Sequence, residues 1–178
     1  AGTWPFVSDL RTGAMSGGSG EQGLLSAACA QMLCHFDLPS GAAAGMCDSK
    51  LPDSQSGYEK GSTAVMAGLA GLNLVYESAG MHASLLGFSL ESMIIDNDML
   101  GQCLRCVRGI EVNNDTLSFD AIKDVCLNGP GHYLGHDRTL AVMESEYVYP
   151  IISDRSSPKE WNENNKPEII NSAHDEVK

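Results

Sequence analysis

Short apolar runs alternate with longer helical stripes over the first part of the chain. Three such runs predict buried strands, at residues 4–10, 42–46 and 72–76. Between them, apolar side chains recur at helical spacing from Glu21 to Phe36, and a second helix is expected over about 55–72. Strands and helices that alternate at this spacing favour a βαβαβ arrangement with parallel strands.

The second of these helices is rich in small side chains. They lie at Gly57, Gly61, Ala64, Gly68 and Gly71. Because a residue without bulk lets another backbone approach, we expect this helix to lie very close to the sheet. The first helix has Ser19 as a candidate N-cap and is closed before Pro39.

The pattern changes after Ser89, where amphipathic helices replace the alternation. Three are expected, at residues 90–107, 118–127 and 138–147. From Ser153 the chain is polar with weak helical periodicity, so we divide the sequence into a main part, 1–152, and a polar helical tail, 153–178. Three strands cannot close a barrel, and the sheet is therefore either a small open α/β sheet or part of a larger barrel.

Composition and charge narrow the range of partners. The 178 residues are 43% hydrophobic and 19% charged, which is enough apolar material for one globular core. The formal net charge is −12, and without a basic face to neutralise phosphates nucleic acid is a poor partner. No apolar run is long enough to span a membrane, so a soluble chain is expected. The six cysteines are sparse and favour free thiols in a reducing, cytoplasmic compartment.

Residues Gly18 to Gly23 match the GxGxxG pattern of dinucleotide-binding turns and open a helix. The predicted strand, however, ends near Leu10, well before the first glycine. Glu21 would also lie among the helix amides that should face a pyrophosphate. We therefore expect a flexible loop that leads into a capped helix, and a nucleotide-dependent α/β enzyme is the weaker alternative.

Two residue pairs have a spacing known from metal sites. Cys103 and Cys106 form a CxxC inside a helical pattern, without the second pair that a zinc ribbon needs. His132 and His136 are four residues apart, yet the flanking glycines argue against a regular helix there. We expect packed thiols and a structural turn, and no tightly bound metal.

The carboxyl ends of the three predicted strands carry the main candidate residues: Asp9, Arg11, Cys47, Asp48, Lys50, Glu77 and Ser78. In parallel α/β folds loops converge on this rim and ligands bind there. Arg11 is the single Lys or Arg in the first 49 residues. It either pairs with a substrate carboxylate or forms a salt bridge with Asp9. Asp48 and Lys50 are equally compatible with an exposed loop, and Glu77 with a buried ion pair.

Four long and unusual sequence blocks resemble the trimethylamine methyltransferase family. They are FVSDLRTGAMSGGSGEQ, DLPSGAAAGMCDSKLPDSQSGYEK, IIDNDMLGQCLRCVRGIEVN and GPGHYLGHDRTLAVMESEYVYP. In that family the fold is a TIM barrel, and the enzyme moves a methyl group from an amine to the Co(I) of a separate corrinoid protein. The resemblance implies that this α/β chain is the carboxyl-terminal part of a TIM (β/α)8 barrel with additional C-terminal helices.

The resemblance also implies a substrate class and its binding residues. Members that act on trimethylamine carry pyrrolysine, and its position falls at Cys47 here, so a pyrrolysine-independent member acting on betaine-like amines is implied. Arg11 would hold the substrate carboxylate, while Asp9 or Glu77 would balance the ammonium. The corrinoid (cobalamin) would be carried by the partner protein, with no metal bound directly by this chain.

Three further expectations accompany this reading. Tyr76 or Phe6 offers a cation–π face to an ammonium, although strand aromatics are more often part of a core. A partial barrel buries its strands incompletely, so self-association into a homo-oligomer is expected. The alternative from another functional class is a non-catalytic fragment or amine-binding module.

Overall fold

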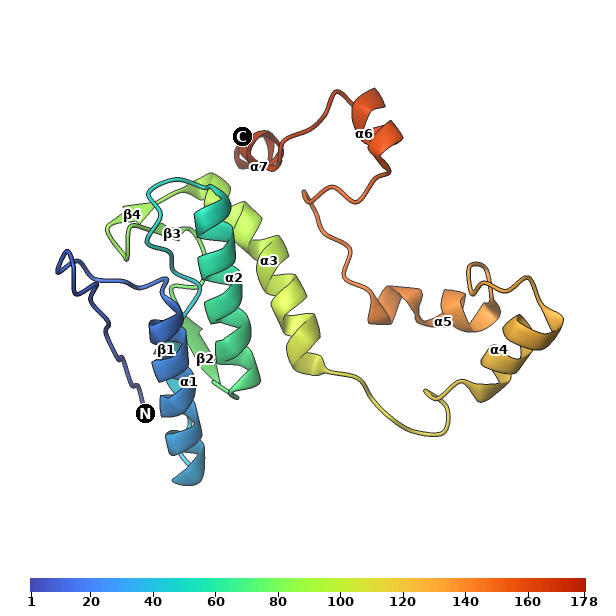
Figure 1. The fold of residues 1–178 in the computed structure, drawn as a ribbon, viewed down its shortest axis with the longest axis horizontal. Helices are drawn as coiled ribbons and strands as arrows, with labels where there is room; N and C mark the ends of the chain where they lie inside the picture. Colours follow the sequence, from blue (N-terminus) through green and yellow to red (C-terminus); the bar gives the residue numbers. More distant parts are fainter. The chain divides into compact units, whose positions relative to one another are not determined.

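The computed structural model describes residues 1–178, which form two compact units (Figure 1). The first unit combines residues 1–107 with 150–178, and the second comprises residues 108–149. The architecture is mixed α/β with short strands and a large share of helix. No helix combines the length and apolar character needed to cross a membrane.

The first unit contains a βαβ element. It comprises the helices and strands α1 (Gly20–His35), β1 (Gly41–Ala43), α2 (Ser54–Leu69) and β2 (Leu74–Tyr76). β1 and β2 are parallel, with Ala42 opposite Val75 and Ala43 opposite Tyr76. This confirms the predicted helices and the parallel pairing. The TIM barrel stays a prediction, since these strands alone make a small sheet.

The predicted strand at residues 4–10 was wrong in its position. The chain pairs with β1 earlier, where Gly2 forms a parallel bridge to Gly41, and residues 4–7 belong to no strand. Pro5 has no N–H to continue the ladder, which explains why the pairing stops. A second bridge, between Ser8 and Met15, closes an exposed turn around Asp9.

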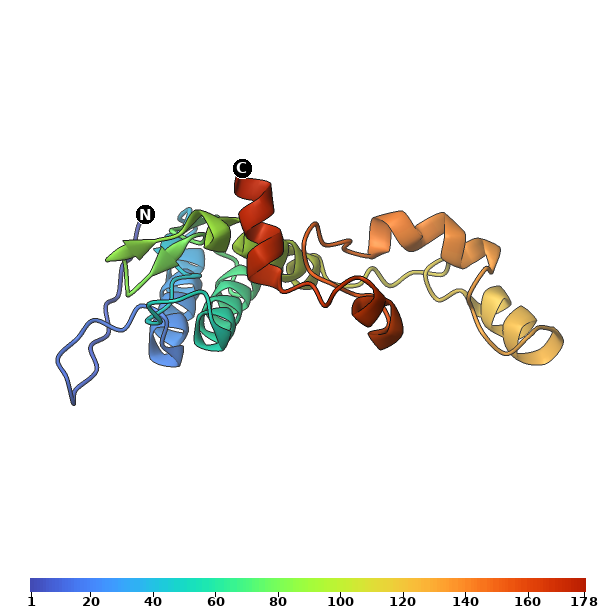
Figure 2. The ribbon, with the colours of Figure 1, turned by 90° about the horizontal axis from the view of Figure 1, so that it is seen from above.

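The core of this unit is built from small residues around β1. Every residue of β1 is buried, and α1 contacts it through the Ser26 hydroxyl, which donates to the Ala43 carbonyl at 3.4 Å. Helices α1 and α2 pack side by side (Figure 2). The Ser19 side chain accepts a hydrogen bond from the Gln22 amide and caps α1, as predicted.

Two glycines of α2, Gly61 and Gly68, face the next helix, α3 (Leu90–Arg108), a contact that the sequence pattern did not predict. A Cβ on Gly68 would lie 2.4 Å from Val107 Cγ2 of α3, while Gly57 and Gly71 face open space. The α2 backbone therefore comes close to an α3 side chain at Gly68. The physical reason is that Val107 needs the room that Gly68 leaves.

A hairpin that the sequence pattern did not predict precedes α3. It consists of β3 (Met81–His82) and β4 (Gly87–Phe88), which pair antiparallel. Of the four residues between them, residues 83–85 have positive φ although none is glycine. The turn therefore lacks the glycine or asparagine signal by which a hairpin is recognised.

The chain returns to the first unit after residue 149 and ends in α6 (Pro158–Glu163) and α7 (Ile169–Val177). The buried carboxylate of Asp98 on α3 accepts hydrogen bonds from the amides of Ile151, Ile152 and Ser153 at 2.8–3.0 Å. His174 on α7 contacts Glu91 at 3.0 Å. These contacts fix the tail, whose helices were only weakly indicated.

The second unit contains α4 (Phe119–Lys123), the π-helical turn η1 (Asp124–Asn128) and α5 (Asp137–Glu146). They correspond to the two predicted helices. Val125 is the only buried residue within these three elements. His136 caps α5, since its Nδ1 accepts from the Arg138 amide at 3.0 Å. This is the structural role expected for that turn.

Candidate functional site

The loops that follow β1 and β2 lie against each other at the carboxyl ends of these strands. Gly45 has φ +82, and a Cβ there would lie 2.9 Å from the backbone of Ser78. Only glycine allows this approach. The geometry brings the segment with Cys47 and Asp48 beside the segment with Glu77, on the rim where parallel α/β folds bind ligands.

Asp48 organises the loop after β1. Its carboxylate accepts hydrogen bonds from the hydroxyls of Ser16 and Ser84, and from the Gly18 amide at 3.2 Å. The Asp48 amide in turn donates to Glu59 Oε2 at 2.7 Å. Asp48 is therefore a partly buried, hydrogen-bonded residue, and the alternative of an exposed loop side chain does not apply.

The glycines of the GxGxxG segment allow other parts of the protein to approach closely. A Cβ on Gly18 would lie 2.8 Å from Cys47 Cα and 2.7 Å from Glu59 Oε2. A Cβ on Gly23 would lie 2.4 Å from the Met66 side chain of α2. The first and last glycines are therefore explained by close contacts within the protein, and the Gly18 amide already binds a carboxylate.

Cys47 is fully buried and faces the hairpin. Its Sγ lies 3.2 Å from His82 Nδ1 and 3.3 Å from the Met81 carbonyl oxygen. His82 Nε2 lies 2.6 Å from the Ser92 hydroxyl on α3. Burial raises the pKa of the Cys47 thiol to about 11 and lowers the pKa of His82, so both groups are neutral near pH 7. A neutral, enclosed thiol is a weak nucleophile.

A buried ion pair supports the same hairpin. Lys60 Nζ on α2 lies 2.6 Å from Asp96 Oδ2 on α3, and their side chains are 2% and 5% exposed. The same carboxylate oxygen accepts from the Gly80 amide at 2.7 Å, directly before β3. The pair thus connects α2, α3 and the segment that carries His82. Sequence reasoning missed His82, Ser92, Lys60 and Asp96, because long-range partners leave no local pattern.

Glu77 directly follows β2 in a left-handed conformation, with φ 59. It is half-buried, and its Oε2 is shielded from solvent without a hydrogen-bond partner. Burial raises the pKa of this carboxyl group. The buried ion pair considered for Glu77 does not form here. The Oε2 atom of Glu77 is thus the unsatisfied polar atom on this rim.

Asp9 and Arg11 form a salt bridge in the exposed turn. Arg11 Nη2 lies 2.6 Å from Asp9 Oδ2, and Nε lies 3.1 Å from Oδ1. Arg11 holds the pKa of Asp9 well below its usual range through this hydrogen-bonded pair. The Arg11 side chain is 88% exposed, and no hydrogen bond or ion pair links it to Cys47 or Glu77. Of the two alternatives for Arg11, the structure contains the salt bridge.

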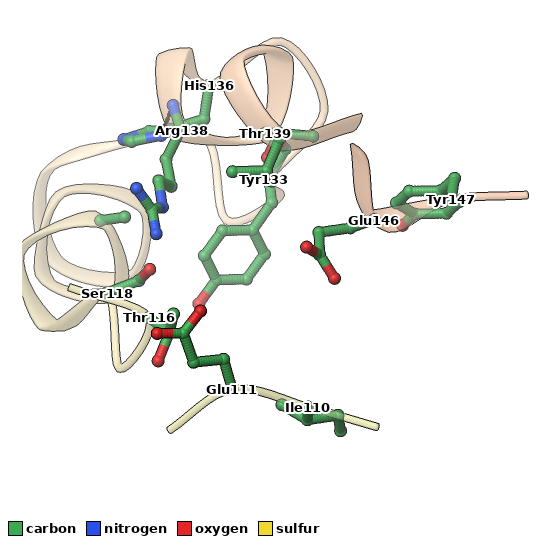
Figure 3. Close-up of a pocket in the computed structure, with 12 residues that line it drawn as sticks. Ile110, Glu111, Thr116, Ser118, Tyr133, His136, Arg138, Thr139, Glu146 and Tyr147 are labelled. Atoms are coloured by element: carbon green, nitrogen blue, oxygen red, sulfur yellow. Dashed lines mark hydrogen bonds between the residues drawn. The ribbon is translucent and has the colours of Figure 1, made fainter. Parts of the chain in front are cut away.

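The second unit has a pocket of its own, of about 360 Å³ (Figure 3). Tyr133, Arg138, Glu111 and Glu146 line it. Arg138 pairs with Asp115 at 2.7 Å. Two further contacts, Arg108 with Glu146 at 3.2 Å and Asn113 with Glu111 at 2.7 Å, occupy the acidic side chains. Because its charges are mutually satisfied, this pocket is a weaker candidate than the rim.

The two motifs with metal-site spacing form no ligand cluster. Cys103 lies on α3 with its Sγ 3.5 Å from Met99 Sδ, and Cys106 is exposed one turn later. All six cysteines are free thiols. No group of three or more His, Cys, Asp or Glu side chains is arranged to hold a metal ion.

The comparisons with known proteins agree on one protein family. The family model described as trimethylamine methyltransferase (MTTB) matches residues 1–178. A glycine betaine methyltransferase of Desulfitobacterium hafniense is 35% identical over 90% of this chain and 33% of its own length. A trimethylamine methyltransferase MttB of Methanosarcina thermophila is 36% identical over 95% of this chain and 34% of its own length. The chain spans about a third of the length of these relatives, and it belongs to the trimethylamine methyltransferase family.

Proposed function

We propose that the protein containing this chain transfers a methyl group from a quaternary or tertiary amine to the Co(I) of a corrinoid carried by a cognate partner protein. Homologues are amine methyltransferases, which supports the reaction class. A betaine-like quaternary amine is the preferred substrate. The corrinoid is the methyl acceptor, and no residue of this chain is assigned to hold it.

Glu77 is the observation that carries the substrate proposal. The Glu77 Oε2 atom at the carboxyl end of β2 has no hydrogen-bond partner, and a cation beside it would stabilise the carboxylate form that burial disfavours. A quaternary ammonium is such a cation.

The reaction makes limited demands on this chain. The substrate C–N bond breaks, nitrogen keeps the electron pair, and the amine product leaves neutral while the methyl group passes to the acceptor. A quaternary ammonium already carries a good leaving group, so orientation and exclusion of water matter more than a general acid. Trimethylamine, by contrast, must first be protonated or captured. The buried neutral Cys47 supplies neither function.

The other proposed binding residues have defined roles. Arg11 would bind the substrate carboxylate. It would do so either while its guanidinium still contacts Asp9 or after the Arg11–Asp9 salt bridge breaks. Cys47 would shape the wall of the site from behind, because its thiol is bonded to the hairpin. We also propose that the protein is located in the cytoplasm and that it forms a homo-oligomer.

Methyl transfer to free Co(I) cobalamin, followed by absorbance, tests the proposal. The intact protein containing this chain is offered glycine betaine, proline betaine, carnitine and trimethylamine in separate reactions. We expect activity with at least one carboxylated quaternary amine and none with trimethylamine. Activity with trimethylamine alone would overturn the substrate assignment, and no activity with any amine would favour a non-catalytic role.

A further inference from the structure

The turn that carries Arg11 is attached to the rim by buried polar contacts. Arg11 belongs to a tight turn, residues 7–16, whose ends are joined by a hydrogen bond from the Ser16 amide to the Val7 carbonyl oxygen at 2.9 Å. For a carboxylate bound to Arg11 and an ammonium at the rim to belong to one substrate, this turn must keep a fixed position relative to the rim. The residues that hold the turn in place therefore affect substrate binding.

Ser84, in the turn between β3 and β4, joins the end of the Arg11 turn to the loop after β1. Its hydroxyl accepts a hydrogen bond from the Gly17 amide at 3.0 Å and donates to the Asp48 carboxylate. The Met15 carbonyl oxygen lies 3.0 Å from the same hydroxyl. Ser84 is only 4% exposed, so one buried side chain contacts both segments.

Asp48 makes the same connection from the loop after β1. Its carboxylate accepts hydrogen bonds from the Ser16 hydroxyl and from the Gly18 amide at 3.2 Å. Hydrogen bonds to an ionised group are stronger than neutral ones. Three consecutive residues at the end of the Arg11 turn, 16–18, are thus bonded to two side chains, those of Asp48 and Ser84.

The backbone holds Ser84 in a conformation that serine rarely adopts. Ala83, Ser84 and Leu85 have φ of +48°, +50° and +83°. The Ala83 amide donates to the Ser49 carbonyl oxygen and the Ser84 amide to the Cys47 carbonyl oxygen, both at 2.9 Å. Left-handed non-glycine residues are unfavourable and persist where the surrounding structure fixes them. A serine at a position that suits glycine better indicates that its hydroxyl has a role.

We propose that Ser84, together with Asp48, is a positioning residue that fixes the Arg11 turn for binding of the substrate carboxylate. This inference rests on the proposed function and adds to it two residues that act through Arg11. Neither residue is assigned a contact with the reacting methyl group. Their effect on binding should therefore depend on whether the ligand has a carboxylate.

Calorimetric binding of glycine betaine and tetramethylammonium to the intact protein tests this role, because tetramethylammonium has the cation without the carboxylate. We expect Ser84→Ala to weaken glycine betaine binding by about 5- to 50-fold, and tetramethylammonium binding by less than about 2-fold, since a loosened turn misplaces Arg11. Ser62→Ala, which removes a hydroxyl bonded to the Glu59 carbonyl oxygen within α2, is the control and should change neither affinity. Equal losses for both ligands in Ser84→Ala would overturn the proposal.

A second variant, Ser84→Gly, separates the hydroxyl from the stability of the turn. Glycine adopts positive φ without strain, so Ser84→Gly lacks the hydroxyl and should unfold at no lower temperature than Ser84→Ala. A positioning role predicts the same selective loss of glycine betaine binding in both variants. Full affinity in Ser84→Gly would assign the loss in Ser84→Ala to the backbone and overturn the role of the hydroxyl.

A double-mutant cycle with Arg11→Ala shows whether Ser84 acts through Arg11. In the Arg11→Ala protein, Ser84→Ala should weaken glycine betaine binding by less than about 2-fold further. Independent effects of the two substitutions would overturn the positioning role, even if methyl transfer from glycine betaine is observed. Coupled effects on binding in a protein that transfers no methyl group would support the positioning role and contradict the proposed reaction. Absence of glycine betaine binding to the wild-type protein would overturn both.

Discussion

Replacement of Lys60 by methionine should strongly destabilise the first unit. The Lys60–Asp96 pair is almost completely buried, so Lys60→Met leaves the Asp96 carboxylate with only the Gly80 amide as a partner. Removing one member of a buried pair costs about 3–5 kcal/mol of unfolding free energy. We therefore expect Lys60→Met to lose about 3–5 kcal/mol of unfolding free energy and to have a lower Tm.

Two comparison variants give this prediction its controls. Lys159 forms an exposed pair with Glu163 at 3.9 Å, and Lys159→Met should change the free energy of unfolding by less than about 0.5 kcal/mol. The double variant Lys60→Met/Asp96→Leu leaves no unpaired charge buried and should recover part of the loss, although the Gly80 amide then lacks its acceptor.

Thermal and urea unfolding of the intact protein, read together with hydrogen exchange, measure the effect. Because Asp96 also holds the Gly80 amide, exchange at Gly80 and His82 should accelerate in Lys60→Met. The reasoning is refuted if Lys60→Met is no less stable than Lys159→Met. It is also refuted if the double variant loses as much stability as the single one.

Three further predictions concern other contacts. Gly18→Ala places a Cβ against the Cys47 backbone and should cost about 1–3 kcal/mol in urea unfolding, while Gly20→Ala, in open space, should not be destabilising. Asp98→Ala leaves the amides of residues 151–153 without their acceptor, and proteolysis should then cleave the tail faster than in wild type. The His174 hydrogen bond lowers the pKa of Glu91 to about 2, so this contact stabilises above the unfolded value of about 4.3 and is lost as pH falls towards 2. Hydrogen exchange in α7 should accelerate over that range, and an unchanged profile in Glu91→Gln would contradict this cause.

The helices and the βαβ element were predictable because their signals are local. Ser19 is a capping residue directly before the apolar stripe of α1, and the apolar run that contains Ala42 and Ala43 is flanked by polar loops. The strand at 4–10 was misplaced because an apolar run does not by itself show which backbone groups pair. Pro5 was the available signal against it.

The site was predictable only in outline. The position of Cys47 and Glu77 after parallel strands follows from topology, and the structure places their loops together. The partners of Cys47, however, are His82 on the hairpin and, through it, Ser92 on α3. Such contacts join residues that are far apart in the sequence. The hairpin that carries His82 was also not predicted, because its turn residues have positive φ without being glycine.

Transfer of a labelled N-methyl carbon from glycine betaine tests the central claim most directly. The intact protein is incubated with Co(I) cobalamin and glycine betaine labelled in all three N-methyl groups, and both products are quantified by mass spectrometry. The account predicts one labelled methyl group on cobalamin for each dimethylglycine formed, and no product from trimethylamine under the same conditions. Intact glycine betaine together with demethylated trimethylamine would contradict it.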